Sequence, residues 1–416
     1  GDSVLLFSEG NVNTVTDDAW LPAAVTTVAA ATTCATDPYG VGASRRKLLT
    51  LSTALPTVSG AALVRSFLHT RYRIVNSGEW GQLMRTDTMP EAAIIDKLRR
   101  DNGLEFRADQ VLVSVGGKQS FFNLAQALLE KGDEVVIPAP YWVSYPDMVM
   151  LADANPVIIA SGIQQGYKIT PEQLDAVIGF QTKLVVINSP SNPTGAVYTR
   201  KELEALGEVL RKYPDVLIAT DDMYEHILWS DEPFCNIVNA CPDLKDRTIV
   251  LNGVSKAYAM TGWRIGYCAG PKPLIAAMKK VQSQSTSNPA SIAQVAAEVA
   301  LRGDQSCMAP MVRAFHERHD HVVARLNRLR GVRCLPSQGT FYAFALFKDA
   351  IAKFEGIGND IEMAELILNE AGVALVPGSA WTHADIGAVG AAMGGALWIV
   401  GEGIDLAGAT TFADAL

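Results

Sequence analysis

The segment Leu251-Asn-Gly-Val-Ser-Lys-Ala-Tyr-Ala-Met-Thr-Gly-Trp-Arg-Ile-Gly266 is the most informative part of this chain. It follows a β-branched run that predicts a strand, so Lys256 lies where the chain leaves a sheet, and Arg264 comes eight residues later. A lysine at a strand end can form a Schiff base with a carbonyl compound, and a nearby arginine can bind a phosphate through two parallel hydrogen bonds. By themselves, the two side chains could equally be surface cations.

The composition describes a large globular protein. The chain has 416 residues, of which 49% are hydrophobic and 19% charged, enough for two domains. A net charge of -9 argues against a nucleic-acid-binding surface. The six cysteines contain no CxxC pair, so we expect neither a disulfide framework nor a zinc site, and reduced thiols fit a cytoplasmic protein. We find no apolar run of about 18 residues that would predict a membrane span.

Between residues 89 and 302, strand-like and helix-like segments alternate. This βαβ pattern predicts a doubly wound, mostly parallel sheet that is covered by helices. The predicted strands are short and rich in Val, Ile and Leu: Gln110–Val115, Glu134–Pro138, Val157–Ile159, Lys183–Asn188, Val216–Thr220 and Thr248–Asn252. Apolar residues at helical spacing predict an amphipathic helix over Gln119–Lys131, ended by Gly132.

Residues 290–330 predict one long helix that leads to a second domain, with strands in 331–347 and 372–376. We therefore expect a large domain over residues 75–300 and a small one over 301–416. Residues 1–74 are expected to join the small domain.

Four loops should lie beyond the carboxyl ends of the strands, where open α/β sheets hold their ligands. In the first, Gly116-Gly117-Lys118-Gln119 exposes backbone amides at a helix start that can receive a phosphate, although it lacks the spacing of a Walker A loop. In the second, Trp142 could stack on an aromatic cofactor or be an ordinary core side chain.

The third and fourth loops supply polar side chains. The proline-stiffened turn Asn188-Ser-Pro-Ser-Asn-Pro-Thr-Gly195 places the amide of Asn192 where it could bond a phenolic oxygen. Asp221 and Tyr224 follow a buried strand, and an inward-facing carboxylate there needs a cation, which a protonated pyridine nitrogen would supply. Each loop alone could also be a plain turn.

Together these segments resemble the fold type I, pyridoxal-phosphate-dependent aminotransferases of class I, most of all the bacterial aspartate aminotransferase group. The resemblance is strongest over residues 89–284 and weaker at Ser337-Gln-Gly-Thr-Phe-Tyr342 and Ala371-Gly-Val-Ala-Leu-Val-Pro-Gly-Ser379. It implies an α/β fold with a mostly parallel, seven-stranded type of sheet in the large domain, and a smaller α/β domain built from both termini. It also implies a homodimer with active sites at the subunit interface.

The resemblance also implies the chemistry. Pyridoxal 5′-phosphate would be the cofactor, and the reaction would be transamination between an L-amino acid, preferably aspartate, and a 2-oxo acid such as 2-oxoglutarate. Lys256 would bind the cofactor covalently and carry the proton between Cα of the substrate and C4′ of the cofactor. Asp221 would keep the pyridine nitrogen protonated, Asn192 and Tyr224 would bond the phenolic oxygen, and Trp142 would stack on the ring.

Further site residues follow from the same resemblance. Those that would bind the phosphate are Gly116, Gly117, Lys118, Ser255 and Arg264. Those that would contact the substrate are Lys118, Trp142 and Asn192, together with Gly10 and Tyr72 in the N-terminal part, Tyr39 being an alternative to Tyr72. Lys118 is the reason to expect a dicarboxylic substrate.

The C-terminal part departs from the family pattern. The family holds the substrate α-carboxylate with an arginine in a late strand, whereas this chain has no arginine after Arg333 and reads Ala396-Leu-Trp-Ile-Val-Gly-Glu-Gly403 there. The usual N-terminal Gly-Glu-Pro-Asp-Phe segment is also absent. Two interpretations are open: true divergence, with another arginine in this role, or a sequence that is wrong at both ends. Elimination or decarboxylation on the same cofactor, and cofactor binding without turnover, are the alternative functions.

We expect no metal site. His316, His319 and Asp320 share one face of a predicted helix and could bind a metal ion. Interspersed arginines instead favour a solvated face.

Overall fold

The structure of the protein is a computed structural model that describes residues 3–8, 19–30, 47–51, 72–77, 80–85, 90–381 and 396–400, with side chains from 91 to 379. It divides into two compact units, Gly1–Met89 and Pro90–Leu416. Apart from Gly10, Tyr72 and its alternative Tyr39, every predicted site residue belongs to the second unit.

The N-terminal unit contains antiparallel strands that the sequence did not predict. β1 (Ser3–Ser8), β2 (Ala19–Ala30) and β3 (Lys47–Leu51) form a three-stranded sheet. β4 (Tyr72–Ser77) pairs with β5 (Trp80–Arg85).

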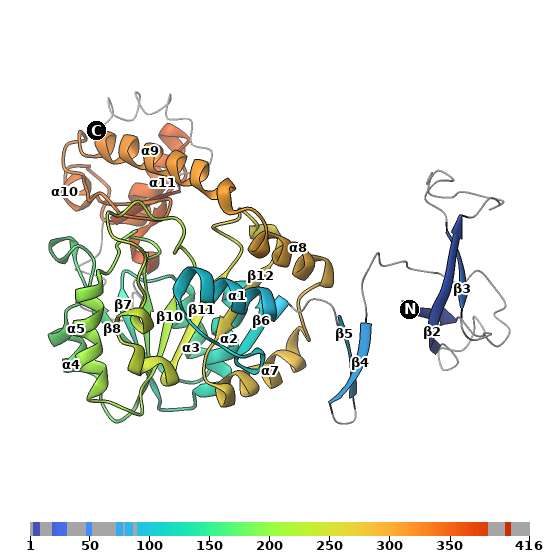
Figure 1. Ribbon diagram of the computed structural model, residues 1–416. Coiled ribbons are helices and arrows are strands. Elements are labelled where there is room, and N and C mark those ends of the chain that lie inside the picture. Colours follow the sequence, from blue (N-terminus) through green and yellow to red (C-terminus); the bar gives the residue numbers. More distant parts are fainter. Residues whose placement is uncertain are drawn as a thin grey trace. The chain divides into compact units, whose positions relative to one another are not determined.

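A seven-stranded sheet forms the centre of the second unit, in the order β6-β12-β11-β10-β9-β7-β8 (Figure 1). Its strands are β6 (Val111–Val115), β7 (Glu134–Ala139), β8 (Asn155–Ala160), β9 (Thr182–Asn188), β10 (Leu217–Asp221), β11 (Thr248–Gly253) and β12 (Ile265–Ala269). The six predicted strands are confirmed, each within two residues at either end. The sequence missed β12, which runs antiparallel to β11 and β6, whereas β8, β7, β9, β10 and β11 are mutually parallel.

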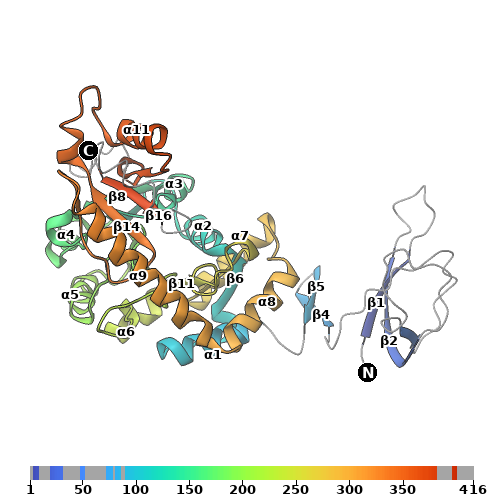
Figure 2. The same cartoon turned by 90° about the horizontal axis from the view of Figure 1, so that it is seen from above.

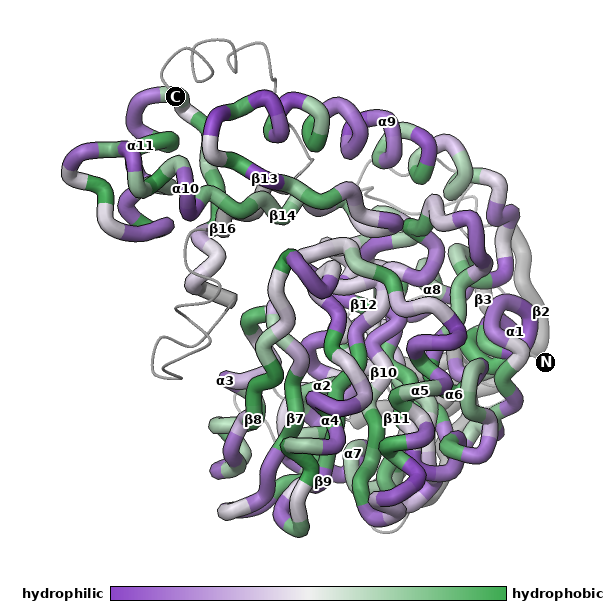
Figure 3. The backbone as a smooth tube through the Cα atoms, turned by 90° about the vertical axis from the view of Figure 1, so that its left-hand side faces the viewer, coloured by the Kyte–Doolittle hydropathy of each residue, from purple (hydrophilic) through white to green (hydrophobic). Residues whose placement is uncertain are grey.

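The central strands are buried on both faces. Val185 of β9 packs into one cluster of core residues and its neighbour Val186 into another, since successive side chains point to opposite faces. A strand covered on both sides needs apolar residues at every position, which explains the continuous Val, Ile and Leu runs. Figure 3 shows this as hydrophobic colour along the strands of the sheet.

Helices cover the two faces of the sheet in different sets. One face packs against α2 (Gly116–Leu128), α3 (Ser144–Met150) and α7 (Lys272–Ser285). The other face packs against α1 (Pro90–Asn102), α4 (Pro171–Val177), α5 (Arg200–Arg211), α6 (Ile237–Ala240) and α8 (Ser291–Arg302). The predicted α/β architecture is thus confirmed.

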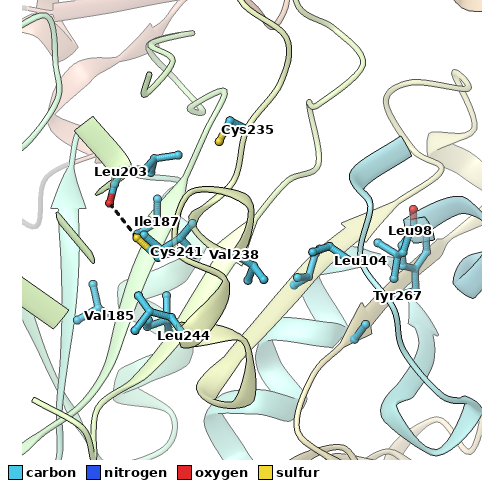
Figure 4. Close-up of a cluster of buried hydrophobic side chains, with 14 of the residues drawn as sticks. Leu98, Leu104, Val185, Ile187, Leu203, Cys235, Val238, Cys241, Leu244 and Tyr267 are labelled. Carbon is cyan, nitrogen blue, oxygen red and sulfur yellow. Dashed lines mark hydrogen bonds between the residues drawn. The ribbon is translucent and has the colours of Figure 1, made fainter. Parts of the chain in front are cut away.

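A buried thiol fills the contact between α5 and α6. Cys241 donates its S–H to the carbonyl of Leu203 at 3.9 Å (Figure 4). A Cβ added to Gly207 would lie 2.2 Å from the sulfur of Cys241, so this position of α5 has no room for a side chain. Burial raises the pKa of the Cys241 thiol, which therefore acts as a neutral packing group.

The C-terminal part forms a second, antiparallel sheet in the order β13-β14-β16-β15. Its strands are β13 (Arg333–Cys334), β14 (Tyr342–Leu346), β15 (Val376–Pro377) and β16 (Ala396–Val400). Its helices are α9 (Met308–Leu326), α10 (Lys348–Ile351) and α11 (Asp360–Ala371). Figure 2 shows α9 running alongside β14, and their side chains share one hydrophobic cluster.

Two helix predictions were wrong in extent. The single helix expected over 290–330 is broken after Arg302, because Gly303 ends α8 and the side chain of Asp304 caps a short 3-10 turn before α9. The helix expected over Gln119–Lys131 is α2, which starts at Gly116 and ends at Leu128. Gly132, with φ of 98°, forms the following turn instead of the helix cap.

No helix in the part of the chain that the structure describes is both long and apolar enough to span a membrane.

The close approach of β12 to the β6–α2 turn gives a testable expectation. A Cβ at Gly266 would lie 2.2 Å from the backbone N of Gly117 and 2.3 Å from C of Gly116. Gly266→Ala should therefore lower the free energy of unfolding by about 1–3 kcal/mol, measured by chemical denaturation, because backbone must move to make room. Gly262→Ala is the control, since nothing lies within 4 Å of its Cβ position. Equal stability of the two variants would contradict this expectation.

Candidate active site

The predicted site residues of the second unit gather at one edge of the seven-stranded sheet. They follow the carboxyl ends of β6, β7, β9, β10 and β11, and Arg264 directly precedes the antiparallel strand β12. Parallel strands end at the same edge, so residues far apart in sequence converge there.

Lys256 lies three residues beyond the end of β11 and is half-buried. Its Nζ is 5.1 Å from the ring centroid of Phe341 and 5.8 Å from that of Tyr224. The ammonium group therefore lies against two aromatic rings, which attract a cation through their π faces. Phe341 was not among the predicted site residues.

Asp221 is the last residue of β10, and its carboxylate has two hydrogen-bond donors. The hydroxyl of Tyr145 donates to Oδ2, and the backbone N–H of Met223 donates to Oδ1 at 3.2 Å. Burial raises the pKa of Asp221, and these two donors oppose that change. Sequence reasoning missed Tyr145, although it lies only three residues after Trp142.

Asn188 joins the third loop to the fourth. Its Nδ2 donates to the backbone carbonyl of Asp221 at 2.9 Å, and its Oδ1 accepts from the N–H of Asn192 at 2.8 Å. The side-chain oxygen of Asn192 is buried and has no hydrogen-bond partner among the described residues. A buried amide with an unused polar atom is what a site for a polar ligand should contain.

Trp142 and Lys118 lie together. Trp142 is half-buried and meets the ring of Tyr145 edge to face, with centroids 5.2 Å apart. The exposed Lys118 places its Nζ 5.2 Å from the centre of the Trp142 ring. A cation thus lies beside the aromatic side chain predicted to stack on the cofactor.

The glycine turn and Arg264 are in direct contact. A Cβ at Gly116 would lie 2.3 Å from Nη2 of Arg264, so only glycine lets the guanidinium reach the start of α2. Arg264 has φ of 55°, a left-handed conformation that is unusual for a residue with a side chain. Strained backbone of this kind collects at functional sites.

The C-terminal sheet contributes to the same site. The hydroxyls of Tyr224 and Tyr342 are hydrogen-bonded to each other. Backbone hydrogen bonds also join the chain after Tyr224 to the chain before Tyr342. The N–H of Thr340 donates to the carbonyl of Ile227 at 2.8 Å, and the N–H of Trp229 donates to the carbonyl of Gln338 at 2.9 Å. The sequence signal for Tyr342 and Phe341 was the Ser337–Tyr342 segment, which carried the resemblance without an assigned role.

A buried ionic cluster lies behind Tyr224. Lys97, 1% exposed, forms an ion pair with Glu225, whose carboxylate also accepts hydrogen bonds from Asn102 at 2.6 Å and from Asn252 at 2.8 Å. Burial opposes the ionisation of Glu225, but Lys97, the neighbouring His226 and the amide of Asn102 together outweigh it and hold the pKa of Glu225 below its ordinary value. The cluster ties α1 to the loop after β10 and to β11.

The buried carboxyl group of Asp222 has neutral hydrogen-bond donors in place of an ion pair. Its oxygens accept hydrogen bonds from Asn236 Nδ2 and Thr220 Oγ1, both at 2.7 Å. Burial, helped by the nearby charge of Glu225, raises the pKa of Asp222 to about 7. The resemblance singled out Asp221 but said nothing of Asp222, whose partners Thr220 and Asn236 lie 2 and 14 residues away in the sequence.

The remaining predicted residues lie in different places. Ser255 is buried, and its carbonyl accepts from Thr261 Oγ1 at 3.0 Å. Tyr72 begins β4 and its side chain lies outside the described residues, as do Gly10 and Tyr39. The late strand expected from the resemblance is β16.

The histidines of α9 have structural partners. His316 stacks on Trp229, with ring centroids 5.0 Å apart, and Nε2 of His319 accepts from the N–H of Ser337 at 2.9 Å. In the described ranges, no three His, Cys, Asp or Glu side chains are grouped to hold a metal ion.

Comparisons with known proteins agree on one family. Residues 47–389 match the family model described as aminotransferase class I and II. The chain is 60% identical over 294 residues to the aspartate/prephenate aminotransferase of Nitrosomonas europaea, covering 70% of this chain and 74% of that protein. It is 52% identical over 301 residues to that of Cereibacter sphaeroides, covering 71% and 75%.

Solved structures give the same result. The aspartate aminotransferase from Rhizobium meliloti matches with a TM-score of 0.73 and 41% identity, over 78% of this chain and 80% of that one. The aspartate aminotransferase from Thermus thermophilus with maleate matches with a TM-score of 0.70 and 37% identity, over 79% and 82%.

The raised pKa of Asp222 predicts a pH-dependent stability. The folded protein keeps this proton up to about pH 7, whereas the unfolded chain loses it near 3.8, so unfolding releases a proton between these values. Relative to Asp222→Asn, the wild type should lose roughly 2–4 kcal/mol of unfolding free energy between about pH 4.5 and 7.5.

Chemical denaturation at several pH values measures this difference. Asp215→Asn, at an exposed position, is the matched control and should follow the wild type. Parallel curves for wild type and Asp222→Asn would show that Asp222 is ionised throughout.

Proposed function

The chain belongs to the class I and II aminotransferase family, and we propose that it transfers the amino group of aspartate, or of a similar L-amino acid, to a 2-oxo acid such as 2-oxoglutarate. The protein is an aminotransferase, and its cofactor is pyridoxal 5′-phosphate. The observation that carries the choice of amino acid is the identity of 60% to an aspartate/prephenate aminotransferase, together with Lys118 beside Trp142.

The residues at the sheet edge fit this cofactor. The buried carboxylate of Asp221 accepts hydrogen bonds from neutral donors, and a protonated ring nitrogen would give it a cationic partner. The amide of Asn192 is buried and not fully hydrogen-bonded among the described residues, which suits a side chain that faces a polar ligand. Arg264 reaches the glycine turn only because Gly116 lacks a side chain, which suits a phosphate held by a guanidinium and backbone amides.

When bound, the cofactor supplies an electron-accepting ring that makes the Cα–H bond of an amino acid acidic. Lys256 would hold the cofactor covalently, and its Nζ would then take the proton from Cα and return it at C4′. The aromatic rings of Tyr224 and Phe341 next to Nζ limit where this amine can move. Holding Nζ in a fixed place favours its action at both positions, taking the proton at Cα and returning it at C4′.

The other side chains would bind the cofactor and orient it. Asp221 would hold a proton on the ring nitrogen through an ion pair, while Asn192 and Tyr224 would donate hydrogen bonds to the phenolic oxygen. Trp142 would cover one face of the ring and exclude water from it. The phosphate would be bound by Gly116, Gly117, Lys118, Ser255 and Arg264.

Lys118 would also bind the distal carboxylate of a dicarboxylic substrate. The related Thermus thermophilus enzyme was solved with maleate, a dicarboxylate, which supports this role. Trp142 and Asn192 would line the same substrate space, with Gly10 and Tyr72 as the N-terminal candidates.

A second candidate function rests on one observation. The sequence has no arginine after Arg333 to hold the substrate α-carboxylate. Loss of that contact favours cofactor binding with little turnover, or another reaction such as β-elimination or decarboxylation. Amino-group transfer to 2-oxoglutarate, measured across an amino-acid panel, separates these from transamination.

A homodimer is part of the proposal, as is a cytoplasmic location. On α8, Ile292 is 74% and Val299 66% exposed, with Val295 between them on the same face. An apolar stripe of this kind is suited to contact with a second copy. We also propose residues 75–300 and 301–416 as the large and small domains, joined by 1–74.

The role of Lys256 can be tested directly. Lys256→Ala should lower the rate of amino transfer from aspartate to 2-oxoglutarate by about 10²–10⁴-fold or more, because the proton carrier is lost. It should also abolish the absorbance of covalently held cofactor. Lys280→Ala, an exposed lysine on α7, is the matched control and should keep both. A variant without Lys256 that retained the covalent absorbance would refute the assignment.

The role of Lys118 predicts a change in substrate selectivity. Lys118→Ala should raise the KM for aspartate by about tenfold, since an ion pair to the distal carboxylate is lost, and leave the KM for alanine nearly unchanged. Steady-state kinetics with both amino acids measure this, with Lys131→Ala as the control. An equal rise for both substrates would assign Lys118 to the cofactor alone.

A further inference from the structure

Tyr145 contacts both Trp142 and Asp221, the two side chains that are proposed to face the cofactor ring. It lies in the first turn of α3, is 1% exposed, and donates its hydroxyl proton to Oδ2 of Asp221. Its ring is held between Phe121, with centroids 4.8 Å apart, and Trp142, at 5.2 Å and an interplanar angle of 89°. Packing on two sides fixes the direction of the hydroxyl, so Tyr145 is a rigid donor.

Asp221 needs such a donor. A carboxylate taken out of water tends to keep its proton, and a neutral Asp221 could not form an ion pair with a ring nitrogen. In the part of the chain that the structure describes, the other donor to this carboxylate is the N–H of Met223, at 3.2 Å. Two further titratable groups lie close to this pair: the charge of Asp222 helps to raise the pKa of Tyr145, and the pair helps to raise the pKa of Tyr224.

We propose that Tyr145 is a positioning residue that keeps Asp221 ionised and aimed at the cofactor's ring nitrogen. The inference rests on the function proposed for Asp221. It adds a residue from α3 whose hydroxyl acts through Asp221 and does not itself touch the substrate.

The protonation state of the Tyr145 hydroxyl suits this role. Burial, together with the charge of Asp221, raises the pKa of Tyr145 well above its ordinary value, so it remains a proton donor. Donation from a neutral phenol to an anion is a charge-assisted hydrogen bond, roughly twice as strong as one between neutral groups.

The first measurement uses the protein without cofactor. Infrared absorption of protonated carboxyl groups is followed with pH in the wild type, Tyr145→Phe, Asp221→Asn and the double variant. Asp221 should take up its proton at a pH roughly one unit higher in Tyr145→Phe, because the phenylalanine ring keeps the packing and removes only the donor. Asp221→Asn identifies the band, since that variant lacks it.

The matched control is Tyr198→Phe. Tyr198 is also buried, and its hydroxyl accepts from the N–H of Ile169 at 2.9 Å, away from Asp221. This variant should titrate like the wild type. The same pH for the Asp221 proton in wild type and Tyr145→Phe would overturn the proposal.

The second measurement is the affinity for pyridoxal 5′-phosphate, by absorbance titration of the same four proteins. Tyr145→Phe should bind about tenfold more weakly than the wild type, but adding it to Asp221→Asn should cost less than about twofold. An equal cost in both backgrounds would mean that Tyr145 contributes packing alone. A wild type that does not bind the cofactor would refute the proposed function, while the infrared titration still decides the role of Tyr145.

Discussion

The burial of one carboxylate at the end of a central strand organises this structure. Asp221 ends β10, in the middle of the sheet, where water cannot solvate its charge. Neighbouring segments provide hydrogen-bond donors to this residue. Tyr145 from α3 and the backbone N–H of Met223 donate to its carboxylate, and Asn188 at the end of β9 donates to its backbone carbonyl. The parallel strands make this convergence geometrically simple, because their carboxyl ends meet at one edge.

Three carboxylates in five residues, Asp221, Asp222 and Glu225, are buried in three different ways. Glu225 is compensated by the ammonium of Lys97, and Asp222 by two neutral donors and a retained proton. Among the described residues Asp221 has only neutral donors, and of the three carboxyl groups it is the one that a cationic ligand would complete. Three neighbouring carboxyl groups thus have three electrostatic states, and for Asp221 and Glu225 the deciding partners come from distant segments.

This dependence on distant segments also limits what could be predicted. Local signals were sufficient for the six parallel-sheet strands, since β-branched runs and their terminal turns are encoded within a few residues. The quoted motifs placed Asp221 and Lys256 at or just beyond strand ends, where the structure has them, and their roles stay predictions. By contrast, Tyr145, Tyr342 and Lys97 act through contacts 76, 118 and 128 residues away, which periodicity does not encode. The break after Arg302 was missed because apolar spacing continues across it.

The seam where β11, β12 and the β6–α2 turn meet is made of backbone. Gly253 pairs with Gly266, and a side chain on Gly266 would strike the backbone of Gly116 and Gly117. Most protein contacts can drift during evolution, because a larger side chain on one side is accommodated by a smaller one opposite. A contact between glycines has no side chain that could become smaller. Evolution can therefore alter the walls of this site, and with them its substrates, while the seam that joins the lysine loop to the glycine turn stays the same.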